Sequence, residues 1–198
     1  MIIAVRMSAV NLKTKEIDIT DDKLLPVLKV RLCCMETKLM YYVKRWIVSI
    51  ILIPVCVYII LHRGEYSWID NADLVIHEAG HFFFMFFGKF IYTAGGTLMQ
   101  IILPSIIAWY FFRNLYRTGV QISLLWLGQN FINISVYAAD ARARRIPLLG
   151  GNKVYHDWHY LLGQLNILEY DTEVGCFFVA LAIIVFIMAL LMPVIIRE

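Results

Sequence analysis

The sequence has few charged residues: Asp, Glu, Lys and Arg make up 17% of its 198 residues, against 61% hydrophobic residues. A soluble domain needs more charge than this on its surface, so the composition predicts a polytopic protein embedded in a lipid bilayer. The net charge of +3 is small, and the basic residues stand beside apolar segments. They are interpreted as topology signals, and no nucleic-acid partner is expected.

Three other absences narrow the range of functions that this sequence can have. The four cysteines include no C-x-x-C pair, which excludes a cysteine metal site and argues against a disulfide framework. Five histidines are too few for a membrane di-iron hydroxylase or desaturase. The N-terminus lacks a basic region followed by an apolar core and a small-residue cleavage site, so no signal peptide is expected.

One motif is present against this background. His77-Glu78-Ala79-Gly80-His81 is an H-E-x-x-H sequence inside an apolar segment. Residues four apart lie on one face of a helix, so His77 and His81 are positioned to bind one metal ion, predicted to be Zn²⁺. Glu78 is placed to accept a proton from water at that metal. Ionisable groups in a membrane helix are costly, which favours a functional site.

The apolar runs predict an all-α fold, a polytopic membrane helical bundle of about five transmembrane helices. The expected spans are residues 46–61, 72–92, 97–112, 120–139 and 175–196. Gly95-Gly96 is expected to allow a tight reversal between the second and third spans. Residues 140–174 form a polar loop, and residues 46–198 are expected to make one membrane domain.

Residues 1–45 are expected to be a cytoplasmic N-terminal extension. They carry nine Lys and Arg against five Asp and Glu, and the loop at 140–174 is also rich in arginine. The positive-inside rule then places the N-terminus in the cytoplasm, in what we expect to be a bacterial inner membrane. Met35 is a second candidate start besides Met1, and residues 1–34 are expected to have little structure of their own.

The polar residues of the fourth span form a helical stripe. Asn130, Asn133, Tyr137 and Asp140 follow 3-4-3 spacing. The stripe either hydrogen-bonds to neighbouring helices or forms a wall of the metal cavity, together with Gln100 of the third span. Both interpretations are open at this point.

A catalytic zinc usually takes three protein ligands, and His77 and His81 supply two. The candidates for the third are Asp140, His156, Asp157 and His159. Straight helices place Asn130 and Asn133, rather than Asp140, at the depth of the motif. If the polar loop folds back into the bundle, His156 or Asp157 reaches the site. Asp140 and His156 are the preferred third ligands.

The H-E-A-G-H sequence on an apolar helix resembles the motif of the site-2-protease-like M50 family of intramembrane zinc metalloproteases. The resemblance implies that Glu78 is a general base and that an Asp in a later L-D-G sequence completes the zinc site. The nearest stretch here is Leu148-Leu149-Gly150, with Leu149 in place of that Asp. The motifs also resemble those of small bacterial membrane proteins of unassigned function.

The sequence therefore favours a membrane-embedded zinc metallohydrolase, a peptidase acting on a transmembrane peptide. The alternative is a non-catalytic metal-binding or transport-related membrane protein, because intramembrane histidines and carboxylates also mark ion pathways.

Overall fold

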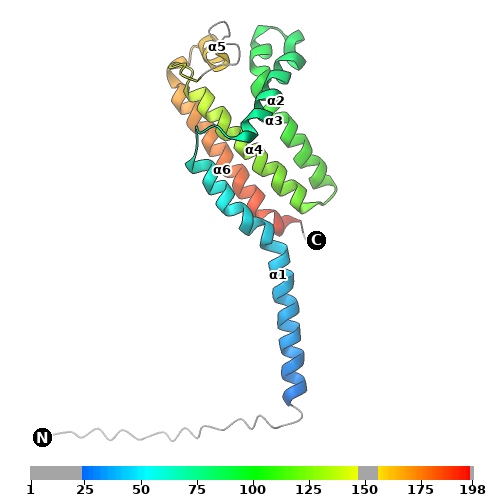
Figure 1. The fold of residues 1–198 in the computed structure, drawn as a ribbon. Coiled ribbons are helices and arrows are strands. Elements are labelled where there is room, and N and C mark those ends of the chain that lie inside the picture. Colours follow the sequence, from blue (N-terminus) through cyan, green and yellow to red (C-terminus); the bar gives the residue numbers. More distant parts are fainter. Residues whose placement is uncertain (1–23, 147–155, 197–198) are drawn as a thin grey trace, which may run out of the picture. The chain divides into compact units, whose positions relative to one another are not determined.

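The computed structural model describes residues 24–146 and 156–196, and within these ranges every regular element is a helix (Figure 1). The all-α prediction is confirmed for this part of the chain. The chain falls into two units, residues 1–43 and residues 44–198. Of the predicted extension at 1–34, residues 1–23 lie outside the described residues. From Leu24 onward the chain belongs to a helix, α1 (Leu24–Leu61).

Three described helical stretches are long and apolar enough to cross a membrane: Lys29–Leu61 of α1, α3 (Lys89–Arg113) and Leu168–Ile195. The last comprises the short helix η3 (Leu168–Tyr170) and α6 (Asp171–Ile195). The predicted count of about five spans is not confirmed. At 17 residues, α2 (Trp68–Phe84) falls just short of the usual length of about 20 residues. α4 (Arg117–Ala139) has 23 residues, but its buried glutamines and asparagines lower its hydropathy.

The helix that carries the motif has a well-defined start. Ser67 caps α2 because its side-chain oxygen accepts a hydrogen bond from the N–H of Ile69, while the Asp70 carboxylate accepts one from the N–H of Ser67. This reciprocal pair satisfies backbone donors that have no partner within the helix. The cap fixes where the helix begins and hence which residues face the bundle.

The break between α2 and α3 lies earlier than the sequence predicted. The short helix η1 (Met85–Phe87) follows α2, and Gly88 then turns the chain with a φ of +83°. The predicted reversal at Gly95-Gly96 is wrong, since both glycines lie inside α3. They serve packing instead: a Cβ built on Gly95 would lie 2.7 Å from the carbonyl oxygen of Gly80 in α2. Small residues allow two packed helices to approach this closely.

The core of the second unit lies between α4 and α6, which run side by side in Figure 1. Gln121 of α4 ties three helices together, because its amide nitrogen donates to Ser49 Oγ of α1 at 2.8 Å and to the carbonyl of Ala189 in α6 at 3.0 Å. Ser49 in turn donates to the carbonyl of Leu190 at 2.9 Å. This group of hydrogen bonds, here called the Gln121 node, is buried among apolar side chains.

The polar segment after α4 folds back over the end of the bundle and forms α5 (Asp157–Gln164). Leu161, Leu162 and Trp158 are buried, and the Trp158 ring meets Phe178 of α6 at a centroid distance of 5.4 Å. His159 Nδ1 donates to the carbonyl of Ala141 at 2.8 Å. These contacts hold the first turn of α5 against α6 and the turn that follows α4.

Candidate metal centre

The two histidines of the motif share one face of α2, as their spacing predicts. Their imidazole centroids are 4.9 Å apart, and the planes are inclined by 78°. His77 is buried and His81 is half-buried. Both rings therefore lie inside the second unit rather than on its outer surface.

Asp157, at the start of α5, completes a three-residue cluster. Its Oδ2 lies 2.9 Å from Nε2 of His77 and 3.3 Å from Nε2 of His81. One ligand atom from each of His77, His81 and Asp157 lies within 4.8 Å of the others. Among the described residues, this is the group of His, Cys, Asp and Glu side chains arranged closely enough to hold a metal ion.

The hydrogen bonds behind the histidines determine which nitrogen atoms face this cluster. His81 Nδ1 lies 2.8 Å from the backbone carbonyl of Tyr92, and a carbonyl can only accept, so Nδ1 carries the proton. His77 Nδ1 lies 3.0 Å from Oε1 of Gln100 and donates to it in the same way. In each neutral imidazole, Nε2 then presents a lone pair toward Asp157.

Two lone pairs and a carboxylate directed at one point repel each other unless a metal ion or a shared proton lies between them. A metal ion with bonds of about 2.0–2.1 Å in a tetrahedral arrangement separates its ligand atoms by about 3.3–3.4 Å, close to the distances found here. Metal-binding histidines usually donate their other ring nitrogen to a carbonyl or carboxamide oxygen, as His77 and His81 do. The donor set therefore fits zinc.

α4 holds Asp157 in place through Tyr137. The backbone N–H of Asp157 donates to the Tyr137 hydroxyl at 3.1 Å, and the same ring lies edge-on to His77 at 5.9 Å. The Asp157 carboxylate thus faces the two histidines from a position that α4 helps to set.

The cluster opens into a cavity of about 910 Å³. Glu78 lines this cavity with His77, His81 and Asp157, and its own side chain is exposed. It is close enough to His81 and Tyr137 to interact electrostatically with both. The carboxylate next to the candidate metal ligands thus has access to water.

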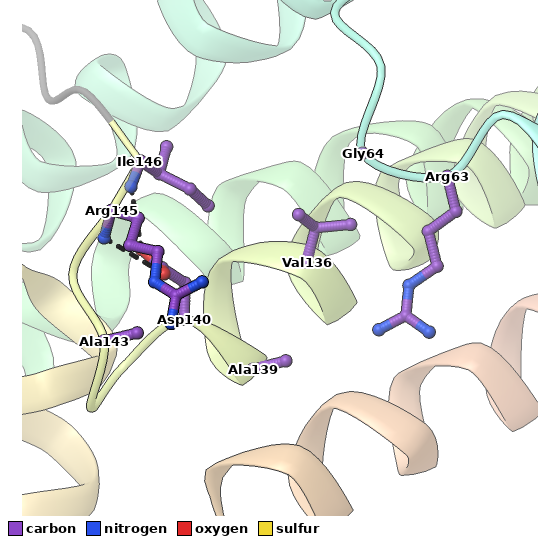
Figure 2. A pocket seen from close by; sticks show the side chains of 8 residues that line it. All are labelled: Arg63, Gly64, Val136, Ala139, Asp140, Ala143, Arg145 and Ile146. Carbon is purple, nitrogen blue, oxygen red and sulfur yellow. Dashed lines mark hydrogen bonds between the residues drawn. The ribbon is translucent and has the colours of Figure 1, made fainter.

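The structure brings Asp157, rather than either preferred third ligand, to the histidine pair. Asp140 ends α4, and its carboxylate accepts the backbone N–H groups of Arg145 and Ile146 at 3.0 and 2.9 Å. Figure 2 shows this turn beside a neighbouring hollow of about 560 Å³, which Arg63 lines from the other side and which shares Gly64, Val136 and Ile146 with the metal cavity. Asp140 closes a turn there and does not line the metal cavity.

His156 also lies away from the pair, although it precedes Asp157. It caps α5 by accepting the N–H of His159, and its Nε2 lies 3.6 Å from Asp140. Its ring lies 4.3 Å from that of Tyr137, with the two planes inclined by 40°. Burial lowers the pKa of the His156 imidazole. Because consecutive residues at a helix start point in different directions, Asp157 faces α2 while His156 faces α4. Leu149 of the compared L-D-G stretch lies outside the described residues.

Among the residues predicted to line the cavity, Gln100 and Asn133 do so. Asn130 is fully buried behind the cavity wall, where its amide nitrogen donates to Asp73 of α2 at 3.2 Å. Asn133 donates to Asp70 at 2.7 Å. The polar stripe of α4 thus both hydrogen-bonds to α2 and contributes to the cavity, which unites the two interpretations of the sequence.

Sequence analysis overlooked the two aspartates that these asparagines contact. Asp70, Asp73, His77 and His81 are spaced 3-4-4 and form one stripe along α2, all lining the cavity. That spacing indicates that the four side chains share one face of α2. The H-E-x-x-H motif drew attention to the two histidines alone.

Comparisons with known proteins add no assignment: no protein-family model matches the chain, and neither curated proteins nor solved structures give a match.

Proposed function

We propose that this protein is an integral membrane zinc metallohydrolase, most similar in chemistry to site-2-protease-like peptidases. The observation that supports this is the meeting of two imidazole Nε2 atoms and the Asp157 carboxylate at one point of a cavity. Two histidines and one carboxylate are a donor set of catalytic zinc sites, and they leave a coordination position for a small molecule.

The proposed reaction divides between the ion and the chain. Bound zinc supplies Lewis acidity, which lowers the pKa of a coordinated water to about 7 and polarises a carbonyl. Glu78 accepts the proton of the attacking water and returns it to the leaving amine. His77, His81 and Asp157 hold the ion, and Gln100 and the Tyr92 carbonyl orient the imidazoles.

The membrane arrangement that belongs to this proposal has five crossings with a cytoplasmic N-terminus in a bacterial inner membrane. α2 packs against α3, and α4 packs against both α3 and α6, so that buried polar side chains such as Asp73, His77 and Asn130 face protein rather than lipid. Polar residues in membrane helices are tolerated in that position. The substrate of a site so placed is a peptide bond in a transmembrane segment.

Metal content tests the first part of the proposal. Elemental mass spectrometry of detergent-purified wild-type protein is expected to find one zinc ion per chain. The double variant His77→Ala with His81→Ala is expected to contain none. His62→Ala is the matched control, because His62 follows α1 directly and stacks on Tyr58 outside the cavity. Equal zinc content in the wild type and the double variant would contradict the proposal.

Catalysis is tested with Glu78→Gln. This variant is expected to keep its zinc and to lose about 10²- to 10⁴-fold in the rate of cleavage of a panel of transmembrane peptides. Glu65→Gln, which neutralises another exposed carboxylate of the same cavity, is the control and keeps its activity. A zinc-loaded protein that neither cleaves peptides nor binds a hydroxamate would instead be the non-catalytic metal-binding or transport-related protein.

A further inference from the structure

Two arginines from distant parts of the chain line the hollow beside the Asp140 turn. Arg63 follows α1 and Arg145 follows α4, and Figure 2 shows them on opposite sides of the hollow with Val136 and Ala139 of α4 between them. Both side chains are exposed. In the described part of the chain, the hydrogen bonds and ion pairs of the structure engage neither guanidinium group. Two positive charges therefore line one hollow without an anionic partner.

The carboxylates near the hollow are engaged by other groups. Asp171 binds the guanidinium and the backbone N–H of Arg142, the neighbouring arginine of the same turn. The Asp140 carboxylate lines the hollow, but its Oδ1 accepts the backbone N–H of Arg145 at 3.0 Å and its Oδ2 that of Ile146 at 2.9 Å. The two guanidinium groups outnumber this single carboxylate, so the hollow has a net positive charge.

The hollow lies where apolar helical stretches of the chain end. The stretch Lys29–Leu61 ends two residues before Arg63, and the stretch Leu168–Ile195 begins on the same side, because Asp171 near its start binds Arg142. A chain advances at most about 3.3–3.6 Å per residue, so Arg63 lies within about 7 Å of the end of its apolar stretch. The headgroup region of each leaflet is about 5–8 Å thick. In a bilayer that these stretches cross, the hollow lies at the level of the lipid phosphates.

The ligand that complements the hollow is an anion with oxygens that point in several directions. A guanidinium group binds phosphate oxygens through a planar fork of N–H donors. Because the two arginines stand on opposite sides, a ligand that contacts both must present oxygens to both sides. A tetrahedral phosphate does so, whereas the two oxygens of a carboxylate lie together on one side of its carbon. The volume of about 560 Å³ leaves room for more than a phosphate ion, such as the glycerol of a lipid headgroup.

We propose that the hollow between Arg63 and Arg145 binds the phosphate group of an anionic phospholipid. Basic pockets between membrane helices are a known means of recognising such headgroups. The proposal needs the chain to lie in a bilayer but does not depend on zinc or on hydrolysis. Because the hollow shares Gly64, Val136 and Ile146 with the metal cavity, a bound headgroup contacts the wall that separates the two spaces.

The test measures binding of dihexanoyl phosphatidylglycerol, an anionic lipid, to the full chain in a non-ionic detergent by native mass spectrometry. The double variant Arg63→Gln with Arg145→Gln is expected to bind it about 10- to 100-fold more weakly than the wild type, because charge-assisted hydrogen bonds are lost. Arg113→Gln with Arg144→Gln removes the same charge from two exposed arginines that do not line the hollow, and this matched control is expected to keep the wild-type affinity. Equal affinity in the two double variants would overturn the proposal.

A second variant and a second ligand complete the test. Ala143→Glu adds a carboxylate to the lining of the hollow while both arginines remain, and it is expected to weaken lipid binding as the double variant does. Thermal unfolding of each variant shows that the fold is kept. Inorganic phosphate is expected to bind more weakly than the lipid, since it lacks the glycerol and acyl groups. Arginine-dependent binding of inorganic phosphate as tight as that of the lipid would overturn the lipid as the ligand, whether or not zinc hydrolysis stands.

Discussion

His81 Nδ1 donates a hydrogen bond to the backbone carbonyl of Tyr92 at 2.8 Å, and this contact fixes the nitrogen that faces Asp157. A carbonyl oxygen cannot donate, so the proton of the neutral ring is at Nδ1 and the lone pair is at Nε2. Tyr92 lies on α3, while His81 lies on α2. The packing of these two helices thus prepares one ligand of the proposed zinc before the ion binds.

The third ligand gives the most direct prediction. Asp157→Asn is expected to reduce the zinc affinity of the purified protein at least 10- to 100-fold, because it removes the anionic member of the cluster. Asp140→Asn is the matched control and is expected to keep its zinc, since Asp140 closes the turn to Arg145 and Ile146. Competition with a fluorescent chelator measures both affinities. Loss of zinc on Asp140→Asn and not on Asp157→Asn would restore the ligand that the sequence favoured.

The amide behind His77 is expected to matter for metal binding without touching the metal. Gln100→Ala removes the acceptor 3.0 Å from His77 Nδ1 and should lower zinc affinity about 10- to 100-fold, the usual effect of losing such a partner. Gln164→Ala, at the exposed end of α5, is the control. Unchanged affinity in the Gln100 variant would show that the ring is oriented by packing alone.

Gly96 is expected to be required because of the ring above it. A Cβ at this position would lie far inside van der Waals contact with His77 Nε2, so Gly96→Ala should displace the imidazole and weaken zinc binding about 10-fold or more. Gly163→Ala places the same methyl group in open space and is expected to have no effect. Zinc affinity and thermal unfolding, measured on both variants, separate displacement of the ligand from loss of the fold.

The start of α6 anchors the segment that leads to α5. Asp171 is 2% exposed and accepts the backbone N–H, Nε and Nη2 of Arg142 at 3.0, 2.8 and 2.7 Å. Asp171→Ala is expected to lower the melting temperature and to loosen zinc binding, because α5 carries Asp157. Glu173→Ala, a neighbouring exposed carboxylate, serves for comparison and should change neither quantity by a comparable amount.

The all-helical fold could be predicted from composition, and the two histidines from their spacing, because both are local properties of the chain. The boundaries between α2 and α3 could not, since Gly95 and Gly96 are equally compatible with a turn and with close helix packing. Only the groups opposite them in α2, Gly80 at Gly95 and the His77 ring at Gly96, decide the matter.

The third candidate ligand also could not be identified from the sequence. Asp140, His156, Asp157 and His159 all lie near the end of α4, and their chemistry does not separate them. The separation comes from a backbone detail: His156 takes the capping position of α5, so the next residue, Asp157, points toward α2. The cavity-lining residues Asp70 and Asp73 carried a periodic signal, 3-4-4 with the histidines, that a search for helical stripes in α2 would find.

The Gln121 node has a consequence for how this protein can vary. Gln121 and Tyr137 are 16 residues apart on α4, which is about 24 Å along a helix. The hydrogen bonds that join α1, α4 and α6 are therefore remote from the cavity and its ligands. Substitutions around the cavity are therefore expected to leave these hydrogen bonds, and the association of α1, α4 and α6 to which they contribute, unchanged.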